Sequence, residues 1–363
     1  MIIDEIESHR GSERRNESDL LPSSGMSSRP RAAPLDLIDD AGVLEPSPVL
    51  EVFGYGAVAA VGGIAVLPRR SDWLEARKTG IEASADWRAI RTGGQRQAVV
   101  HLQKGRDATW QGLAEAWSRL EEGGRLLLAG GNELGIKSAV KRLSGELGQP
   151  AEILANRARA RVACWRREGA TEPVRPVVSP IQVVTNADRF ALRSAPGVFS
   201  ADGVDPGTQL LLSHLDALPP PEAIFDPGCG LGVLGLTALR RWPDATAVLA
   251  DADNRAVECA VGSAADLGLA DRCEVMWWDA TRDPTPKISC DLVLVNPPFH
   301  SGVPVDLQPA RAIFHAIAAV LPPGGRCLVV ANRTLPWERD LREIGDLRQL
   351  TESRGYKILE LRK

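Results

Sequence analysis

The sequence predicts an α/β protein with two tandem Rossmann-like halves, and three observations predict it. Apolar runs of strand length alternate with amphipathic helical stretches from about Val49 onward, as in parallel α/β architectures. A charged, Pro-rich stretch without a helical stripe, 166–180, separates two such regions. The two regions also carry similar sequences at corresponding places, which indicates a duplicated domain. A chain of 363 residues has the length for two domains.

The predicted strands are short apolar runs, and the predicted helices between them carry one apolar face. The strands are expected at 98–102, 126–129, 223–225, 247–250, 291–295 and 327–331, with helices at 109–120 and 309–321 among those between them.

The duplication rests on two pairs of segments. LEEGGRLLLA begins at Leu120 and LPPGGRCLVV at Leu321, while VFGYGAV begins at Val52 and FDPGCGLGV at Phe225. The alternative is that α/β proteins reuse GGR turns by chance. We therefore predict a Ser-, Arg-, Glu- and Pro-rich disordered tail over 1–40, a first domain over 41–168, a linker over 169–181 and a second domain over 182–363.

Composition excludes several classes of protein. With 43 Lys and Arg against 47 Asp and Glu, the net charge of −4 excludes a globally basic nucleic-acid coat, although a local basic patch stays possible. Apolar runs all fall short of the roughly 18–20 residues that cross a bilayer. The polar N-terminal stretch is unlike a signal peptide, and the six cysteines have neither CxxC nor His-linked metal spacing. We expect a cytoplasmic monomer without membrane contact, bound metal or disulfides.

The strongest local signal is the segment Asp226-Pro-Gly-Cys-Gly-Leu-Gly232, which directly follows the apolar run AIF. Its glycines allow a sharp turn from strand to helix and a close approach of a ligand to the backbone. The free N–H groups at the start of the following helix suit a polar or anionic ligand group. Part of the segment, Gly230-x-Gly232-x-x-Gly235, also fits a dinucleotide fingerprint, which by itself is a weak signal.

Three acidic residues stand at the ends of successive predicted strands. Asp226 precedes the glycines and can orient the amino-acid part of a bound methionine moiety. Asp251 follows the next strand and can accept hydrogen bonds from ribose hydroxyls, which suits NAD and S-adenosylmethionine alike. Asp279 follows a third run and can accept from an adenine amine. Solvated acids at strand ends are the alternative for Asp251 and Asp279.

The motif that favours an S-adenosylmethionine site over an NAD site is Asn296-Pro297-Pro298-Phe299, after the apolar strand DLVLV. Consecutive prolines cannot continue a central strand, so the chain leaves the sheet there on a rigid path. The Asn296 carbonyl and a neighbouring backbone carbonyl can both accept from one planar amine, which orients its lone pair toward an electrophilic methyl group. Phe299 can stack on the flat acceptor. A purely structural turn is the alternative interpretation.

With these motifs the chain resembles the class I S-adenosylmethionine-dependent methyltransferases of the NPPF/Y type. More narrowly, it resembles the bacterial ribosomal RNA small-subunit guanine-N2 methyltransferases. The resemblance covers 190–363 and rests on PGVFSADGVDPGTQLLL, DPGCGLGVLGL, VNPPFHSG and PPGGRCLVVANRTLPW. In that family a degenerate methyltransferase-like domain precedes the active one. Pro227 departs from the usual DVGCG, and the long N-terminal tail is a second departure.

The resemblance implies a role for each matched position. The glycine loop would hold the methionine end of S-adenosylmethionine, the next two acids its ribose and adenine, and the NPPF motif the target amine. Phe199, Asp202 and the Gly207–Thr208 turn would help to close the pocket. The expected cofactor-binding residues are Asp226, Gly228, Cys229, Gly230, Asp251, Asp279, Ala280 and Asn296, and the expected catalytic residues are Asn296, Pro297, Pro298 and Phe299.

Other residues receive structural interpretations. The first region has His101-Leu-Gln-Lys104 where NPPF would stand, and Gly54-Tyr-Gly56 lacks a preceding Asp, so this copy is expected to be inactive. Cys229 is expected as a small filler of the loop rather than a nucleophile, and His300 is not expected as a general base.

The resemblance implies transfer of a methyl group to the exocyclic N2 of a guanine in ribosomal RNA, with 16S RNA or the small ribosomal subunit as partner. Alternative acceptors are 23S guanine N2, adenine N6 and protein glutamine, and the other classes are an NAD(P)-binding oxidoreductase and a non-catalytic RNA-binding factor. Arg157, Arg159 and Arg161, followed by 166–167, would place three guanidinium groups on one face of an extended segment and suit phosphate contact. A charged edge strand is an equal alternative.

Overall fold

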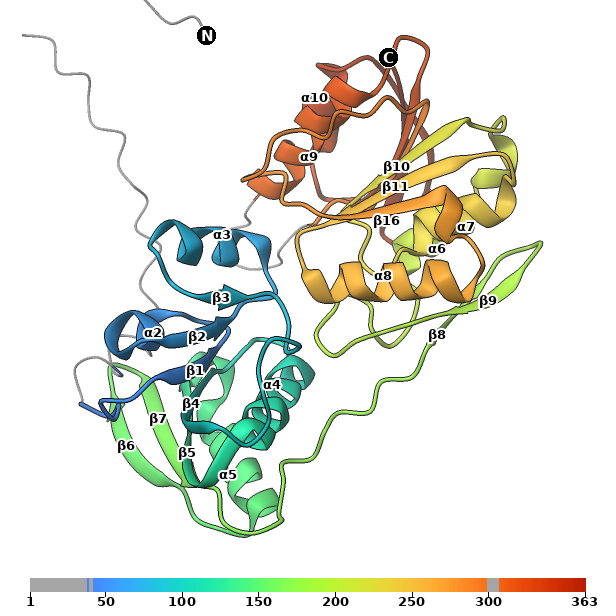
Figure 1. The fold of residues 1–363 in the computed structure, drawn as a ribbon. Coiled ribbons are helices and arrows are strands. Elements are labelled where there is room, and N and C mark those ends of the chain that lie inside the picture. The colour runs from blue at the N-terminus through green and yellow to red at the C-terminus, as the bar shows by residue number, and fades with distance from the viewer. Residues whose placement is uncertain (1–37, 39–41, 299–306) are drawn as a thin grey trace, which may run out of the picture. The chain divides into compact units, whose positions relative to one another are not determined.

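The computed structural model describes residues 38, 42–298 and 307–363, and these described residues belong to one compact unit. This unit contains two seven-stranded sheets with their helices and a two-stranded ribbon (Figure 1). The predicted disordered tail, 1–40, lies outside the described residues except for Ile38, which is buried in the core of the first half.

The first half runs from Val49 to Arg166. Its strands and helices alternate as the sequence predicts, and its last two strands form a hairpin. The elements in order are β1(Val49–Val52), α2(Gly56–Val61), β2(Gly63–Val66), α3(Arg70–Lys78), β3(Ala83–Ser84), β4(Gln95–His101), α4(Arg106–Arg119), β5(Leu120–Gly131), η1(Asn132–Leu134), α5(Ile136–Leu147), β6(Glu152–Arg157) and β7(Ala160–Arg166).

The second half begins with a two-stranded ribbon and then repeats the same succession. The elements in order are β8(Ile181–Val184), β9(Arg189–Leu192), α6(Pro206–Leu212), η2(Leu215–Ala217), β10(Ala223–Pro227), α7(Val233–Arg241), β11(Thr246–Asp251), α8(Asn254–Asp266), η3(Ala270–Arg272), β12(Cys273–Trp277), β13(Leu292–Val295), α9(Gln308–Val320), β14(Arg326–Asn332), α10(Trp337–Arg342), β15(Asp346–Ser353) and β16(Tyr356–Arg362).

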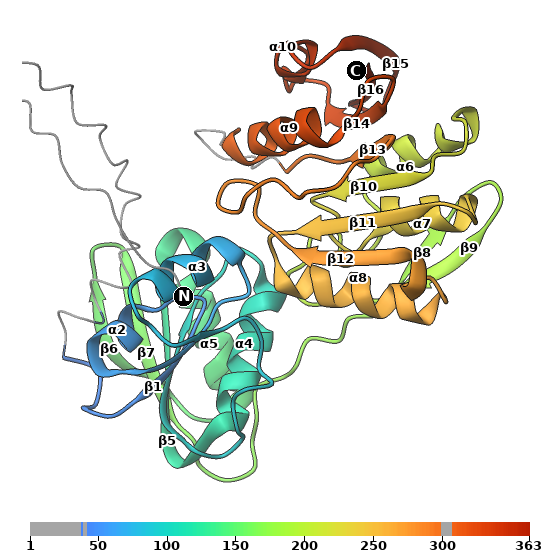
Figure 2. The same cartoon turned by 45° about the horizontal axis from the view of Figure 1, so that its top comes forward.

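The two large sheets share one strand order. The first is β3-β2-β1-β4-β5-β7-β6 and the second is β12-β11-β10-β13-β14-β16-β15, which is the same permutation of seven strands. In each sheet the first five strands are parallel, and the last two form an antiparallel hairpin. Figure 2 shows β10, β11 and β12 side by side with α8 along the sheet. The predicted tandem α/β fold is therefore confirmed, and the equal topologies support the duplication.

The central strands of each sheet, such as β1 and β13, are buried on both faces, because helices cover both sides of a parallel sheet. Two clusters of buried apolar side chains flank the second sheet, one containing Leu249 and Leu294 and the other Phe225 and Val293. Alternate residues of one strand thus enter opposite clusters, since successive side chains of a strand point to opposite faces. This double burial explains why the strands read as continuous apolar runs.

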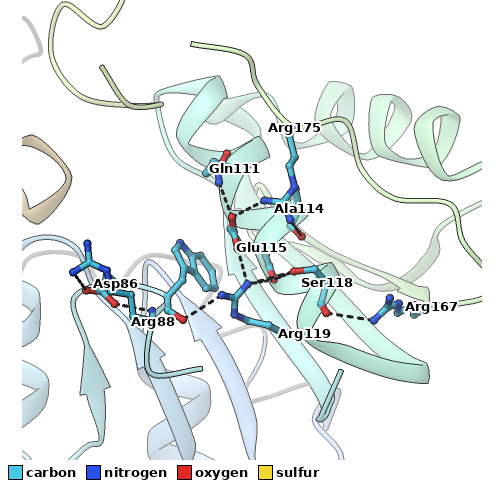
Figure 3. A network of polar contacts seen from close by, with 10 residues as sticks. Asp86, Arg88, Gln111, Ala114, Glu115, Ser118, Arg119, Arg167 and Arg175 are labelled. Atoms are coloured by element: carbon cyan, nitrogen blue, oxygen red, sulfur yellow. Dashed lines mark hydrogen bonds and ion pairs between the residues drawn. The ribbon is translucent and has the colours of Figure 1, made fainter. Parts of the chain in front are cut away.

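The Pro-rich segment between the two halves is hydrogen-bonded to α4. Glu115 accepts hydrogen bonds from Arg119 at 2.5 Å, from Arg175 at 2.5 Å and from Gln111 at 2.8 Å (Figure 3). Arg167 also donates to the backbone carbonyl of Leu120. The Pro-rich segment therefore follows the surface of the first half between β7 and β8.

The two halves also contact one another within the compact unit. Arg70, the first residue of α3, donates through Nε and Nη2 to the two carboxylate oxygens of Asp283, at 2.8 and 2.9 Å. Trp73 of the same helix meets Trp277 edge to face, with ring centroids 5.3 Å apart. The first half is thereby joined to the loop that follows β12.

The predicted extended arginine face is wrong. The chain reverses at Ala158 and Arg159, whose φ angles of 50° and 60° lie in the left-handed region. Arg157 ends β6 and pairs with Ala160, while Arg161 lies in β7 opposite Asn156. The three guanidinium groups consequently belong to two strands and a turn, and Arg167 donates to a backbone carbonyl of its own half. A period-two argument fails wherever a tight turn interrupts the strand.

Within the described parts of the chain, no helix is both long and apolar enough to cross a bilayer.

Candidate active site

The candidate site lies where the strand order of the second sheet reverses. The connection from β10 leads to β11 on one side, whereas β13 pairs with β10 on the other. Ligands of open α/β sheets bind outside the carboxyl ends of strands at such a point. A cavity occurs here, and its lining includes Phe199, Thr208, Asp226, Gly228, Gly230 and Asn296.

The loop after β10 depends on its glycines. Gly228, Gly230 and Gly232 have φ angles of 77°, 55° and 82°, which residues with a side chain rarely adopt. The backbone N–H groups of Gly228 and Cys229 both donate to the carbonyl of Ala250, at 2.7 and 3.0 Å. A Cβ added at Gly230 would meet nothing within 4 Å, so the loop backbone borders open space there.

Asp226 lies in β10 and is buried beside this loop. Its side chain is 1% exposed, and Oδ2 accepts from the backbone N–H of Gly235 in α7 at 2.8 Å. Burial raises the pKa of Asp226 to about 7; the hydrogen bond from Gly235 opposes this rise and the nearby Asp251 adds to it. Asp226 therefore anchors α7 and also lines the cavity.

Asp251, the last residue of β11, is hydrogen-bonded to the same loop. Its Oδ2 accepts from the N–H of Gly230 at 2.8 Å, and its Oδ1 from the N–H of Asp253 at 2.8 Å. Burial raises the pKa of Asp251 to about 6, and both of these hydrogen bonds oppose the rise. The carboxylate thus lies beside the glycine loop with lone pairs remaining for further donors.

Asp279 and Ala280 lie outside the set of residues that line the cavity. Asp279 Oδ1 accepts from the N–H and the hydroxyl of Thr281, at 2.8 and 2.6 Å, and its own N–H donates to Asp283. The N–H of Trp278 donates to the carbonyl of Asp251 at 2.9 Å, which ties this loop to the end of β11. The structure therefore brings Asp279 near the edge of the site, but not into the cavity.

Asn296 is the first residue after β13, and its amide is held from one side. Nδ2 donates to Thr208 Oγ1 at 3.0 Å and to Asp205 Oδ2 at 3.2 Å. Pro298 lies beside the glycine loop, since a Cβ added at Gly228 would be 3.9 Å from its Cδ. Phe299 and His300 lie outside the described residues. Asn296 and the loop after β10 thus line one cavity.

Sequence reasoning missed Asp205, which also lines the cavity. Asp205 caps the N-terminus of α6 by accepting from the N–H of Thr208 at 2.9 Å, and Pro206 follows at the first helical position. The signal was present in the sequence, because Asp-Pro directly before a helix is an N-cap signature. Asp202, which was expected at the pocket, lines a different surface hollow.

Cys229 lies in the loop but is not arranged as a nucleophile. Its side chain is 8% exposed, and burial raises the pKa of its thiol, which disfavours the reactive thiolate. All six cysteines are free. The described residues contain no group of His, Cys, Asp and Glu side chains that could hold a metal ion.

Comparison with known proteins shows the family of the chain. The model of the methyltransferase small domain matches residues 189–360. Ribosomal RNA small subunit methyltransferase C of Pseudomonas aeruginosa strain LESB58 is 34% identical over 319 residues, covering 83% of this chain and 91% of that protein. Its counterpart in Pseudomonas fluorescens strain Pf-5 is 34% identical over 276 residues, covering 73% of this chain and 79% of that protein.

One solved structure matches both halves. The Thermus thermophilus 16S rRNA N2 G1207 methyltransferase, solved in complex with AdoMet and guanosine, superposes with a TM-score of 0.80 at 25% identity. The match covers 92% of each chain, so it includes the first seven-stranded sheet as well as the second. The chain belongs to the family of ribosomal RNA small subunit methyltransferase C.

Proposed function

We propose that this protein transfers a methyl group from S-adenosylmethionine to the exocyclic N2 of a guanine in 16S ribosomal RNA. The observation that carries the proposal is the shared cavity of Asn296 and the glycine loop after β10. The relatives support the substrate, because they act on small-subunit RNA by name and one was solved with AdoMet and guanosine.

The residues present fit this cofactor. The loop backbone at Gly230 is open to a ligand, and Asp226 presents a buried carboxyl to the same cavity. Gly228, Cys229 and Gly230, with Asp226, would hold the methionine end, and Asp251 would accept from the ribose hydroxyls. Asp279 and Ala280 would lie toward the adenine. When bound, S-adenosylmethionine would supply a sulfonium-activated methyl group: the N–C bond would form as the S–CH3 bond breaks, S-adenosylhomocysteine would be the leaving group, and one N–H proton of the amine would pass to solvent.

The chain's own contribution is orientation. Asn296 Oδ1 and the backbone carbonyl of Pro297 would accept the two hydrogens of the guanine amine, so that the nitrogen lone pair points out of the ring plane. The two prolines fix the path of the backbone that carries these acceptors. Phe299 would stack on the extruded base. Positioning of this kind requires no general base on the protein, in agreement with an acceptor that is already a neutral amine.

The first half is proposed to bind neither cofactor nor base. His101, the last residue of β4, contacts Glu51 Oε1 at 2.6 Å, and Glu51 is fully buried. This pair fills the space above Gly54, where an added Cβ would be only 2.5 Å from the His101 ring. A Cβ added at the corresponding glycine of the second half, Gly228, would meet nothing closer than 3.7 Å.

A labelling assay tests the proposal. The full chain is incubated with tritiated S-adenosylmethionine and 16S RNA, naked or within 30S subunits, and the RNA is digested to nucleosides. Label in N2-methylguanosine, at least about a hundredfold lower for Asn296→Ala, is the expected result. Label in N6-methyladenosine, or in protein when 30S subunits are used, would identify an alternative acceptor, and a parallel incubation with 23S RNA tests the remaining one. Full activity of Asn296→Ala would refute the assigned mechanism.

A further inference from the structure

The amide of Asn296 faces a carboxylate, and this fixes which of its ends is free for a substrate. Nδ2 carries two hydrogens, and its two contacts are Thr208 Oγ1 at 3.0 Å and Asp205 Oδ2 at 3.2 Å. An ionised carboxylate only accepts hydrogen bonds. The end of the amide that faces Asp205 must therefore be the NH2 group, and Oδ1 points the other way.

Asp205 is itself held from two further directions. Oδ2 accepts from the N–H of Thr208 at 2.9 Å as the N-cap of α6, and the hydroxyl of Tyr356 in β16 lies 3.5 Å from Oδ1. The N-terminus of α6 lies directly against Tyr356, since a Cβ added at Gly207 would be 2.6 Å from the ring. The carboxylate is therefore held by contacts with α6 and β16, and it contacts Asn296 directly after β13.

We propose that Asp205 is a positioning residue for methyl transfer, which acts through Asn296. It selects the amide rotamer that presents Oδ1 to the target amine, and Thr208 supports the same rotamer. An amide turned by 180° would present NH2 to the amine, so that two donors would face each other and the amine would not be oriented. This inference rests on the proposed function, because it concerns the same acceptor site.

The substitution Asp205→Gly separates this role from helix capping. Oδ2 accepts from both Thr208 N–H and Asn296 Nδ2, so an asparagine that kept the cap would also keep the contact with Asn296. Glycine is well tolerated at an N-cap, so α6 is retained. Without the carboxylate, the hydroxyl of Thr208 can donate to Asn296 Oδ1, and the wrong rotamer is no longer excluded. Asp291→Gly is the matched control, because Asp291 accepts from the N–H groups of Glu222 and Ala223 at the other end of β13, away from the cavity.

The decisive experiment is a double-mutant cycle over wild type, Asp205→Gly, Asn296→Ala and the double variant. The turnover number is measured at saturating S-adenosylmethionine, so that a changed affinity for this cofactor does not enter. We expect Asp205→Gly to lower kcat about 10–100-fold in the wild-type background and less than about twofold in the Asn296→Ala background. An equal loss in both backgrounds would overturn the inference, because a general structural effect does not depend on Asn296.

A second variant covers the case in which Asp205→Gly does not fold. Thr208→Val removes the other acceptor of Nδ2 and leaves the capped N–H in place, and the same cycle with Asn296→Ala applies to it. Guanine methylation by the wild type with additive losses would refute only the positioning role. Failure of the wild type to methylate any RNA would refute the proposed function and the inference with it.

Discussion

The carboxylate of Asp251 accepts a hydrogen bond of 2.8 Å from the backbone N–H of Gly230, which joins the end of β11 to the loop that follows β10. Its other oxygen accepts from the N–H of Asp253 at the start of α8. One side chain therefore holds both the loop after β10 and the start of α8.

The substitution Asp251→Asn tests this relationship. An asparagine can accept only one of the two hydrogen bonds, and its NH2 group would face the other backbone N–H. We expect the affinity for S-adenosylmethionine, measured by calorimetry, to fall about 10–150-fold. The control is Asp266→Asn, whose carboxylate pairs with Arg193 on the surface. A loss for the control as large as that for Asp251→Asn would contradict the prediction.

The pKa of Asp226, raised to about 7, predicts a pH-dependent cofactor affinity. If the carboxylate form holds the methionine ammonium group, the affinity rises as Asp226 ionises. We expect about tenfold tighter binding of S-adenosylmethionine at pH 8 than at pH 6, and a much smaller change for Asp226→Asn. An equal pH dependence in both proteins would exclude Asp226 as its source.

The raised pKa of Asp226 also predicts the direction in which the free energy of unfolding changes with pH. Folded Asp226 keeps its proton above the pH at which the unfolded residue loses it, so the folded state binds more protons between about pH 4 and pH 7. The free energy of unfolding therefore falls as the pH rises through this window. Thermal denaturation of Asp226→Asn without cofactor should show a smaller fall, and a fall as large as that of wild type would show that the charge on Asp226 is not its cause.

The buried pair of Glu51 and His101 predicts a single cofactor site. Calorimetric titration of the full chain with S-adenosylmethionine should give about one molecule bound per chain. Asp226→Ala should abolish this binding, while Glu51→Gln should leave the stoichiometry and the affinity unchanged. Two molecules bound per wild-type chain would contradict the inactivity of the first half.

Glu115 predicts a stability effect that is separate from activity. Glu115→Ala removes the partner of Arg119, whose side chain is only 9% exposed, and releases Arg175 of the segment between the halves. We expect a loss of about 1–3 kcal/mol, seen as a lower thermal midpoint, with unchanged cofactor affinity. Glu121→Ala is the control, because its pair with Arg96 is exposed and should contribute less than about 0.5 kcal/mol. Equal midpoints of the two variants would contradict this account.

The parts of the fold that repeat in sequence could be predicted, and the reason is burial. The apolar run 327–331 lies within β14, and the run 98–102 lies within β4 except for its last residue, because central parallel strands are covered on both faces. The hairpin at Ala158 and Arg159 could not be predicted from alternation, since two non-glycine residues adopt positive φ angles there. Tertiary pairing outweighs local preference at that turn.

The candidate site likewise has residues that the sequence predicts and residues that only the fold brings together. The loop after β10 and Asn296 can be recognised in the sequence, because glycines at fixed spacing and a double proline are typical of few other structures. Asp205 precedes Asn296 by 91 residues in the chain, and only the fold brings the two together. Asp279 follows the expected strand, yet its first oxygen bonds to its own loop through Thr281. Spacing alone predicts a strand end but not the direction of a side chain.

Nucleoside mass spectrometry of 16S RNA from a strain that lacks this gene tests the central claim most directly. The account predicts that one N2-methylguanosine disappears, that the wild-type gene restores it and that Asn296→Ala does not. Primer extension on the same RNA then gives the position of the nucleotide. An unchanged content of N2-methylguanosine in the deletion strain, or full restoration by Asn296→Ala, would contradict the account.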